Sequence, residues 1–170
     1  MKEKNIEKTN VMRILTQKKI PHEQRCYLDS GAVSGREVAK ALGQDERCVF
    51  KTLVTRGHSK KYYVFVIPVC GELNLKKAAK AAGEKSIEMI PQKELLPLTG
   101  YIHGGCSPVG MKKPFPTFVD ASAKQREHIM VSAGKIGYQV ELSPQDLAKA
   151  VPLSFADIAD FEDGEQKDGK

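Results

Sequence analysis

Apolar positions along the chain switch between the spacing of helices and the alternation of strands. In residues 9–19 they recur at i, i+3 and i+4, which predicts an amphipathic helix. Residues 49–56 and 62–69 are rich in β-branched and aromatic side chains, and a short polar segment separates them. Such a pattern is typical of a β-hairpin.

Capping signals delimit two further helices. Ser34 and Glu37 have the spacing of a capping box, and Gly43 suits the position after the helix, so we predict about two turns between them. Asn74 and Gly83 are a matching start and stop for a second helix. The other predicted elements are strands in residues 21–28, 86–90, 117–120, 128–131 and 138–142, a helical turn in 91–96, and a last helix that begins at Ser143.

The order of these elements indicates the fold class. Strands outnumber helices, and the helices interrupt them rather than alternate with them, which favours an α+β fold over a doubly wound one. We therefore predict a compact single domain, with a mixed, barrel-like β-sheet and flanking helices, over residues 1–160. Residues 161–170 are polar and are expected to form a disordered tail.

The charge balance of the chain indicates what class of partner it binds. The chain of 170 residues has 27 Lys and Arg against 21 Asp and Glu, a net charge of +6. The excess favours a polyanionic partner, nucleic acid first, with a solvated basic surface as the alternative. No apolar run is long enough for a membrane span, the N-terminus does not resemble a secretory signal, and the four cysteines stand alone. These features predict a protein of the reducing cytoplasm.

The most unusual stretch is a glycine-rich loop over residues 100–116, which reads GYIHGGCSPVGMKKPFP. It holds four glycines and three prolines in seventeen residues. Such a loop can turn backbone N–H groups towards a ligand, because glycine permits close approach and proline fixes the backbone. It can equally be a tight connection between two strands.

Lys51 is the second candidate for a binding role. Strand alternation places Phe50 and Thr52 on one face of the predicted strand and Lys51 on the other, among apolar neighbours. If the strand is central, the lysine is an anchor for an anion; if it is at an edge, the lysine is a surface residue.

No conventional catalytic set accompanies these features. His103 and Cys106 could form a nucleophile pair, but no acid orients them, and Ser107 lies outside any nucleophile elbow. We also find no P-loop and no spacing of metal ligands, and we expect neither a metal nor a cofactor. What remains is a pocket of backbone donors with one lysine, which could stabilise an oxyanion without a protein nucleophile.

At the level of longer motifs, the chain resembles the YbaK/EbsC family of aminoacyl-tRNA deacylases. The motifs are FKTLV (50–54), VIPVCGELNLKKAAKAAG (66–83), the glycine-rich loop and VSAGKIGYQVEL (131–142). They follow in order over roughly residues 8–160. Within the family, the likeness is greatest to the enzymes that act on Cys-tRNA(Pro) and Cys-tRNA(Cys), rather than to the editing domain of prolyl-tRNA synthetase.

The resemblance implies a trans-editing enzyme that hydrolyses or cleaves the ester of mischarged Cys-tRNA(Pro). Small side chains are discriminated by only ~1–3 kcal/mol in a synthetase pocket, so a second sieve is needed. In this family the cysteinyl thiol attacks its own ester carbonyl and releases tRNA and a cyclic thiolactone. The enzyme then needs only to orient that thiol and stabilise the developing charge. Prolyl-tRNA synthetase is an implied partner.

The resemblance also implies roles for individual residues. The catalytic positions would be Lys51, Gly104 and Gly105, and the substrate-binding positions Tyr27, Thr52, Cys106, Ser107, Ser132 and Gln139. The candidates for contact with the tRNA are Lys76, Lys77, Lys80, Lys112 and Lys113, with a solvated lysine face as the alternative for the first three.

Two positions depart from the family pattern and leave the substrate open. Ser34 and Gly35 stand near a family phenylalanine, and Gln139 stands where the family has an acid. A deacylase of Ala-tRNA(Pro) type, which would use a positioned water, is therefore an alternative. A module that binds tRNA or a synthetase without catalysis is another.

Overall fold

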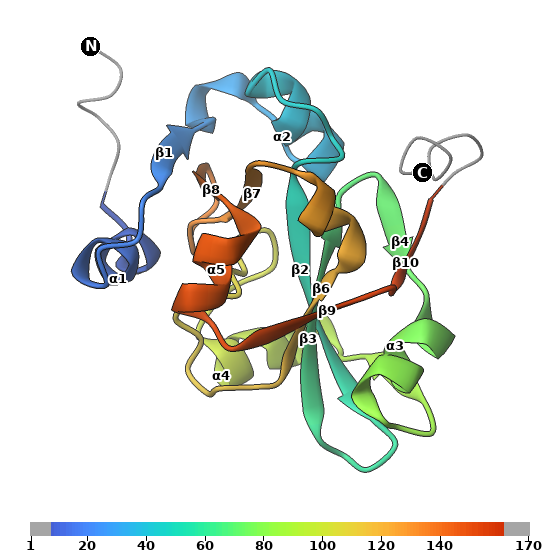
Figure 1. The fold of residues 1–170 in the computed structure, drawn as a ribbon. Coiled ribbons are helices and arrows are strands. Elements are labelled where there is room, and N and C mark those ends of the chain that lie inside the picture. The colour runs from blue at the N-terminus through green and yellow to red at the C-terminus, as the bar shows by residue number, and fades with distance from the viewer. Residues whose placement is uncertain (1–7, 162–170) are drawn as a thin grey trace.

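Two β-sheets form the centre of the computed structural model, which describes residues 8–161 (Figure 1). In that range the larger sheet has the order β5-β2-β3-β6-β9, the smaller has the order β1-β8-β7, and β4 and β10 form a separate ribbon. The strands are β1 (Glu23–Cys26), β2 (Phe50–Gly57), β3 (Tyr62–Pro68), β4 (Gly71–Leu73), β5 (Ile87–Met89), β6 (Thr117–Asp120), β7 (Ile129–Ser132), β8 (Tyr138–Leu142), β9 (Leu153–Ala156) and β10 (Ala159–Phe161).

The helices are short and surround these sheets. They are α1 (Asn10–Gln17), α2 (Gly35–Ala41), α3 (Leu75–Ala82), α4 (Leu95–Thr99) and α5 (Pro144–Ala150), with 3₁₀ turns η2 (Leu28–Ser30), η3 (Gln92–Glu94) and η4 (Ala121–Gln125). The predicted caps are confirmed: Ser34 and Glu37 form a capping box, and the Asn74 side chain accepts a hydrogen bond from Lys77 N at 2.9 Å. Gly83 ends α3 with φ +73°.

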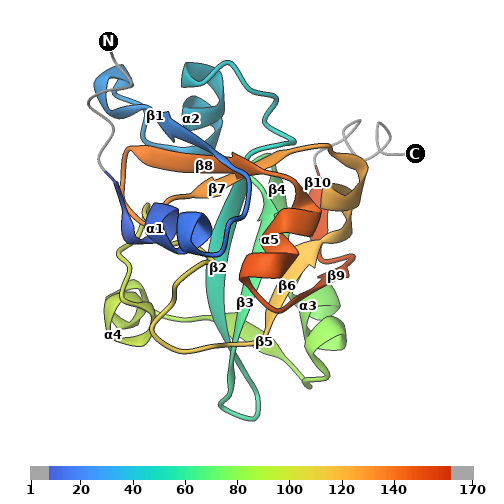
Figure 2. The same cartoon turned by 60° about the vertical axis from the view of Figure 1, so that its left-hand side comes forward.

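The larger sheet is mixed, as predicted for this fold class. β5, β2 and β3 are antiparallel, whereas β6 runs parallel to both β3 and β9. The two sheets meet where Val49 bridges to Met130, with Met130 N donating to Cys48 O at 2.8 Å. Figure 2 shows β7 and β8 crossing the upper end of β2, which closes the sheets into a barrel-like shape.

Each face of β2 and β3 packs against a different layer. Phe50, Val54 and Val66 belong to a core shared with the smaller sheet and α1. Phe65 and Ile67, which point the other way, pack against the alanine face of α3. The alternation predicted from the sequence is therefore what places the strand between two cores.

Three short strands were not predicted. β9 extends the larger sheet beside β6, and β10 pairs with β4. Phe161 belongs to β10, so the predicted tail begins one residue too early, and residues 162–170 lie outside the described part of the chain.

Candidate active site

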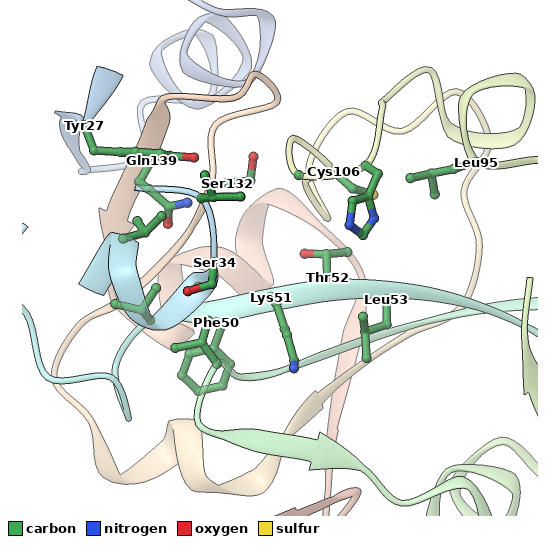
Figure 3. Close-up of a pocket in the computed structure, with 17 residues that line it drawn as sticks. Tyr27, Ser34, Phe50, Lys51, Thr52, Leu53, Leu95, Cys106, Ser132 and Gln139 are labelled. Atoms are coloured by element: carbon green, nitrogen blue, oxygen red, sulfur yellow. The ribbon is translucent and has the colours of Figure 1, made fainter. Parts of the chain in front are cut away.

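A pocket of about 250 Å³ opens beside the first half of β2. Its walls come from β2, the N-terminal end of α2, Leu95 of α4, the glycine-rich loop, and the smaller sheet (Figure 3). Of the predicted site residues, the pocket collects Tyr27, Lys51, Thr52, Gly104, Cys106, Ser132 and Gln139. Segments that are far apart in the sequence thus meet in one concave site.

Lys51 and Thr52 project from opposite sides of β2 (Figure 3). Lys51 is half-buried, and the structure gives its ammonium no ion pair or hydrogen bond within residues 8–161. β5 pairs only with residues from Thr55 onwards, so β2 has an open outer edge beside Lys51. β2 pairs with β3 along almost its whole length but with β5 only from Thr55 onwards. The prediction of a central strand therefore holds for the end of β2 and not for the part that carries Lys51.

Two buried oxygen atoms in the pocket have no hydrogen-bond partner within residues 8–161. They are Thr52 Oγ1 and Gln139 Oε1. A buried polar atom without a partner costs about 1–3 kcal/mol, so such atoms mark places where a ligand can form hydrogen bonds.

The smaller sheet supplies the wall that carries Gln139. Gln139 of β8 pairs with Ser132 of β7, and Tyr27 follows β1 on the other side, with its N–H donating to Gly137 O at 2.8 Å. The Ser132 hydroxyl accepts a hydrogen bond from Gly134 N at 3.1 Å. Strand pairing therefore brings Tyr27, Ser132 and Gln139 together, as Figure 3 shows.

The glycine-rich loop contributes Gly104 and Cys106 to the pocket, but not Gly105. Gly105 N donates to Ile102 O at 3.0 Å, so this N–H is engaged within the loop, and a catalytic role for Gly105 stays a prediction. The glycine is needed for close approach: a Cβ there would lie 3.1 Å from the backbone nitrogen of Ile136. Gly105 thus packs the loop against the turn between β7 and β8.

Ser107 also lies away from the pocket wall. Its side chain is fully buried, and its hydroxyl accepts a hydrogen bond from Val109 N at 3.2 Å. The predicted contact with substrate is therefore not supported by the position of Ser107, which shapes the loop from inside.

Cys106 lines the pocket as a neutral thiol. Burial raises its pKa to about 12, so the reactive thiolate is scarce at neutral pH. His103 lines the same pocket but is exposed, and no hydrogen bond joins it to Cys106 among the described residues. The Cys–His nucleophile considered from the sequence lacks both an activated thiol and a positioned base.

None of the five lysines predicted to contact tRNA lines the pocket. Lys76, Lys80 and Lys113 are exposed, and Lys112 Nζ donates to Pro97 O at 3.4 Å. Lys77 is instead paired with Asp157 at 3.1 Å and Asp160 at 3.5 Å, and the hydrogen bond to Asp157 raises its pKa. Its main contact is with the C-terminal part of the fold.

Several wall residues were not found from the sequence. Leu95 and Val38 are apolar residues on short helices, and Val33 is 88% exposed at the pocket mouth. Ser34 and Gly35, noted as departures from the family pattern, do line the pocket. The signal available in the sequence for Val33 was an apolar residue directly before the Ser34 cap.

The described residues show neither a cluster of metal ligands nor a membrane-spanning helix. Within residues 8–161, no three His, Cys, Asp or Glu side chains gather in a way that could hold a metal ion. In the same range, every helix is too short or too polar to cross a membrane.

Comparisons with known proteins agree with this geometry. The family model described as the aminoacyl-tRNA editing domain matches residues 29–150. A protein of Enterococcus faecalis, provisionally named the Cys-tRNA(Pro)/Cys-tRNA(Cys) deacylase EbsC, is 46% identical over 158 residues, covering 92% of this chain and 96% of that protein.

Solved structures have the same fold. The crystal structure of the hypothetical protein APE2540 superposes with a TM-score of 0.81 at 25% identity, over 88% of this chain and 99% of that one. A candidate trans-editing enzyme for prolyl-tRNA synthetase gives a TM-score of 0.77 at 22% identity, over 88% and 94%. The predicted fold class is confirmed, and the chain belongs to the family of aminoacyl-tRNA editing domains.

Proposed function

We propose that the protein is a trans-acting deacylase that removes cysteine from Cys-tRNA(Pro) and, as a second substrate, from Cys-tRNA(Cys). One observation carries the proposal: among the residues that the structure describes, the pocket has an ammonium and two buried oxygens without partners, but no activated nucleophile. A site of this kind suits a substrate that brings its own nucleophile. The E. faecalis relative supports cysteine as the amino acid.

Because the substrate supplies the nucleophile, the reaction takes place within the cysteinyl ester itself. The cysteinyl sulfur forms a bond to its own carbonyl carbon, and the bond from that carbon to the ribose oxygen breaks. The thiol proton ends on the ribose oxygen, so the products are a cyclic thiolactone and free tRNA. An intramolecular thiol has a high effective concentration once it is oriented, which leaves charge stabilisation to the enzyme.

Lys51 supplies the positive charge of the site. Its ammonium lies on the side of β2 opposite Thr52, so it serves the ribose–phosphate end of the substrate rather than the amino-acid side chain. A lysine is suited to this because its ammonium is a compact charge with three donors. Exposed lysines outside the pocket, such as Lys76 and Lys80, would add sequence-independent attraction for the tRNA.

The test is a deacylation panel with purified protein. Cys-, Ala-, Ser- and Pro-tRNA(Pro), together with Cys-tRNA(Cys), are incubated with and without the protein, and the products are separated. We expect fast loss of both cysteinyl esters, release of the thiolactone, and background rates for the others.

Other results would point elsewhere. Equal turnover of alanyl and cysteinyl esters would favour the water-using, Ala-tRNA(Pro) type of deacylase, because alanine has no thiol. Gel-shift binding with every ester at its uncatalysed rate would indicate the non-catalytic module.

The proposal extends to location and partner. Mischarged tRNA(Pro) leaves prolyl-tRNA synthetase in the cytoplasm, so we place the protein there and name that synthetase as its partner. Co-sedimentation of the two proteins with tRNA(Pro) tests the partnership, and separate migration at micromolar concentration would contradict it.

A further inference from the structure

The outer edge of β2 is covered on both sides of the pocket but open within it. At one end β7 lies alongside, with Met130 N donating to Cys48 O at 2.8 Å. At the other end Ile90 N donates to Val54 O at 3.4 Å, where β5 begins. Thr52 lies between these two covered stretches and lines the pocket.

The register of the β2–β3 hairpin shows which backbone groups face this opening. Val69 N donates to Val49 O, and Gly57 N donates to Lys61 O, each at 2.8 Å. In antiparallel pairs the hydrogen-bonded residues alternate, so the odd-numbered residues of β2 turn their N–H and C=O groups towards β3. Pro68, which has no N–H, accordingly lies opposite Phe50 in a non-bonded pair.

Thr52 must therefore turn both its N–H and its C=O outwards, into the open edge. Backbone groups in a buried place are nearly always hydrogen-bonded, and an open strand edge is a ready template for another strand. Among the described residues, the Thr52 hydroxyl on the same residue is buried without a hydrogen-bond partner. The site thus has one donor and one acceptor at the spacing of a single residue of a β-strand.

We propose that the aminoacyl group of the substrate pairs with Thr52 as a one-residue antiparallel strand. The inference rests on the proposed function. An aminoacyl ester has an ammonium that can donate to Thr52 C=O and a carbonyl oxygen that can accept from Thr52 N–H, which is the exchange made by a hydrogen-bonded pair. The Thr52 N–H then stabilises the oxyanion when the thiol attacks.

The pairing also decides where the amino-acid side chain goes. Residues directly opposite in an antiparallel pair have their side chains on the same face. The side chain of an L-amino acid would therefore lie beside that of Thr52, on the side of Cys106 and Leu95, and away from Lys51 (Figure 3). A D-amino acid would direct its side chain towards the lysine.

A backbone substitution tests the donor without changing a side chain. The α-hydroxy acid analogue of threonine is incorporated at position 52, which replaces the peptide N–H by an ester oxygen. The matched control places the same analogue at Thr55, whose backbone faces Tyr63 of β3 and which does not line the pocket. Both proteins are assayed on Cys-tRNA(Pro) and unfolded thermally.

We expect kcat to fall on the order of 10²-fold for the analogue at 52, as for the loss of one oxyanion donor, with little change in Tm. The analogue at 55 should lower Tm, because it breaks a ladder hydrogen bond, and keep kcat. A kcat within threefold of wild type for the analogue at 52, or an equal loss at both positions, would overturn the inference.

Two further measurements separate this inference from the proposed function. Wild-type turnover above the uncatalysed rate tests the function alone. Binding of L-cysteinyl-3′-amino-adenosine, a non-hydrolysable amide, should move the Thr52 amide-proton resonance downfield, and an unmoved resonance at saturation would count against the pairing. With an active wild type, D-cysteinyl-tRNA(Pro) should react at least tenfold more slowly, and equal rates would contradict the assignment of faces.

Discussion

Lys51 is half-buried in the pocket and, within the described residues, its ammonium has no protein partner. Removing its charge should therefore affect the substrate more than the fold. We expect Lys51→Ala to lower kcat/KM about 10- to 100-fold, since a hydrogen bond to a charged group contributes about 1.5–3 kcal/mol. Deacylation kinetics and thermal unfolding are the measurements.

Two variants make the Lys51 result specific. Lys51→Arg keeps the charge but not the geometry and should fall between wild type and alanine. Lys40→Ala removes an exposed lysine of α2 and should change neither rate nor Tm. Equal activity of Lys51→Ala and Lys40→Ala would remove Lys51 from the mechanism.

Cys106 is either a passive residue of the pocket wall or a nucleophile, and one substitution distinguishes these two roles. Its neutral, buried thiol predicts that Cys106→Ala keeps deacylation within about threefold, whereas loss of a true nucleophile costs many orders of magnitude. Single-turnover assays at several pH values are suitable. A drop beyond 100-fold, together with a lost alkaline limb in the rate profile, would restore Cys106 as the nucleophile.

At the scale of elements, the site depends on how closely the glycine-rich loop meets the β7–β8 turn. Gly105→Ala would bring a methyl group to 3.1 Å from Ile136 N, where only backbone can give way. We expect the loop to shift, Gly104 and Cys106 to leave their positions, stability to fall by about 1–3 kcal/mol, and kcat/KM to fall at least tenfold.

The control for Gly105 is a glycine in open space. Gly43 has φ +67° and no atom within 4 Å of an added Cβ, so Gly43→Ala carries backbone strain without a clash. It should lower Tm slightly and leave the rate unchanged. If Gly105→Ala behaves in the same way, the packing of loop against turn does not shape the pocket.

Elements with strong local signals were the ones that the sequence could predict. The caps of α2 and α3 and the alternation of β2 and β3 are set by neighbouring residues, and they appear where expected. β4, β9 and β10 are short and owe their existence to distant partners, so no local pattern marks them.

The same limit applies to the site. That Lys51 and Thr52 point to opposite sides followed from alternation. That Gly105 N–H bonds to Ile102, or that Lys77 pairs with residues of the C-terminal segment, depends on tertiary packing and had no signal in the residue order. The resemblance to a family named seven of the seventeen residues that line the pocket, but could not say which backbone groups were free.

For the molecule as a whole, stability should fall at both ends of the pH scale. The pKa of Glu84 is lowered from 4.5 to about 2, first by the hydrogen bond from Ser59 and then by that from Tyr63. As pH falls, the unfolded chain binds this proton at a higher pH than the folded chain does. The stabilisation of the fold by ionised Glu84 is therefore complete above about pH 4.5 and is lost as pH falls towards 2.

At the alkaline end of the pH scale, burial of two side chains raises their pKa values, and stability falls as pH rises. Burial raises the pKa of Cys106 from 9.0 and that of Tyr101 from 10.0, both to about 12. The unfolded chain loses these protons first, so stability declines as pH rises from about 9 to 12. Urea unfolding across pH measures both limbs; Glu84→Gln should flatten the acid limb and Cys106→Ala the alkaline one. Unchanged slopes in these variants would contradict the assignment.

The pairing of β1 with β8 has a consequence for when the enzyme becomes competent. Glu23 pairs with Glu141, so the wall with Tyr27 and Gln139 joins opposite ends of the chain, whereas the β2–β3 hairpin is local. Distant contacts form late because loop closure must come first. A nascent or refolding chain should therefore acquire its hairpin before its catalytic activity, and pulse-labelled hydrogen exchange alongside recovered deacylation would reveal that delay. A chain that has formed only its hairpin would therefore be partly folded but unable to deacylate mischarged tRNA.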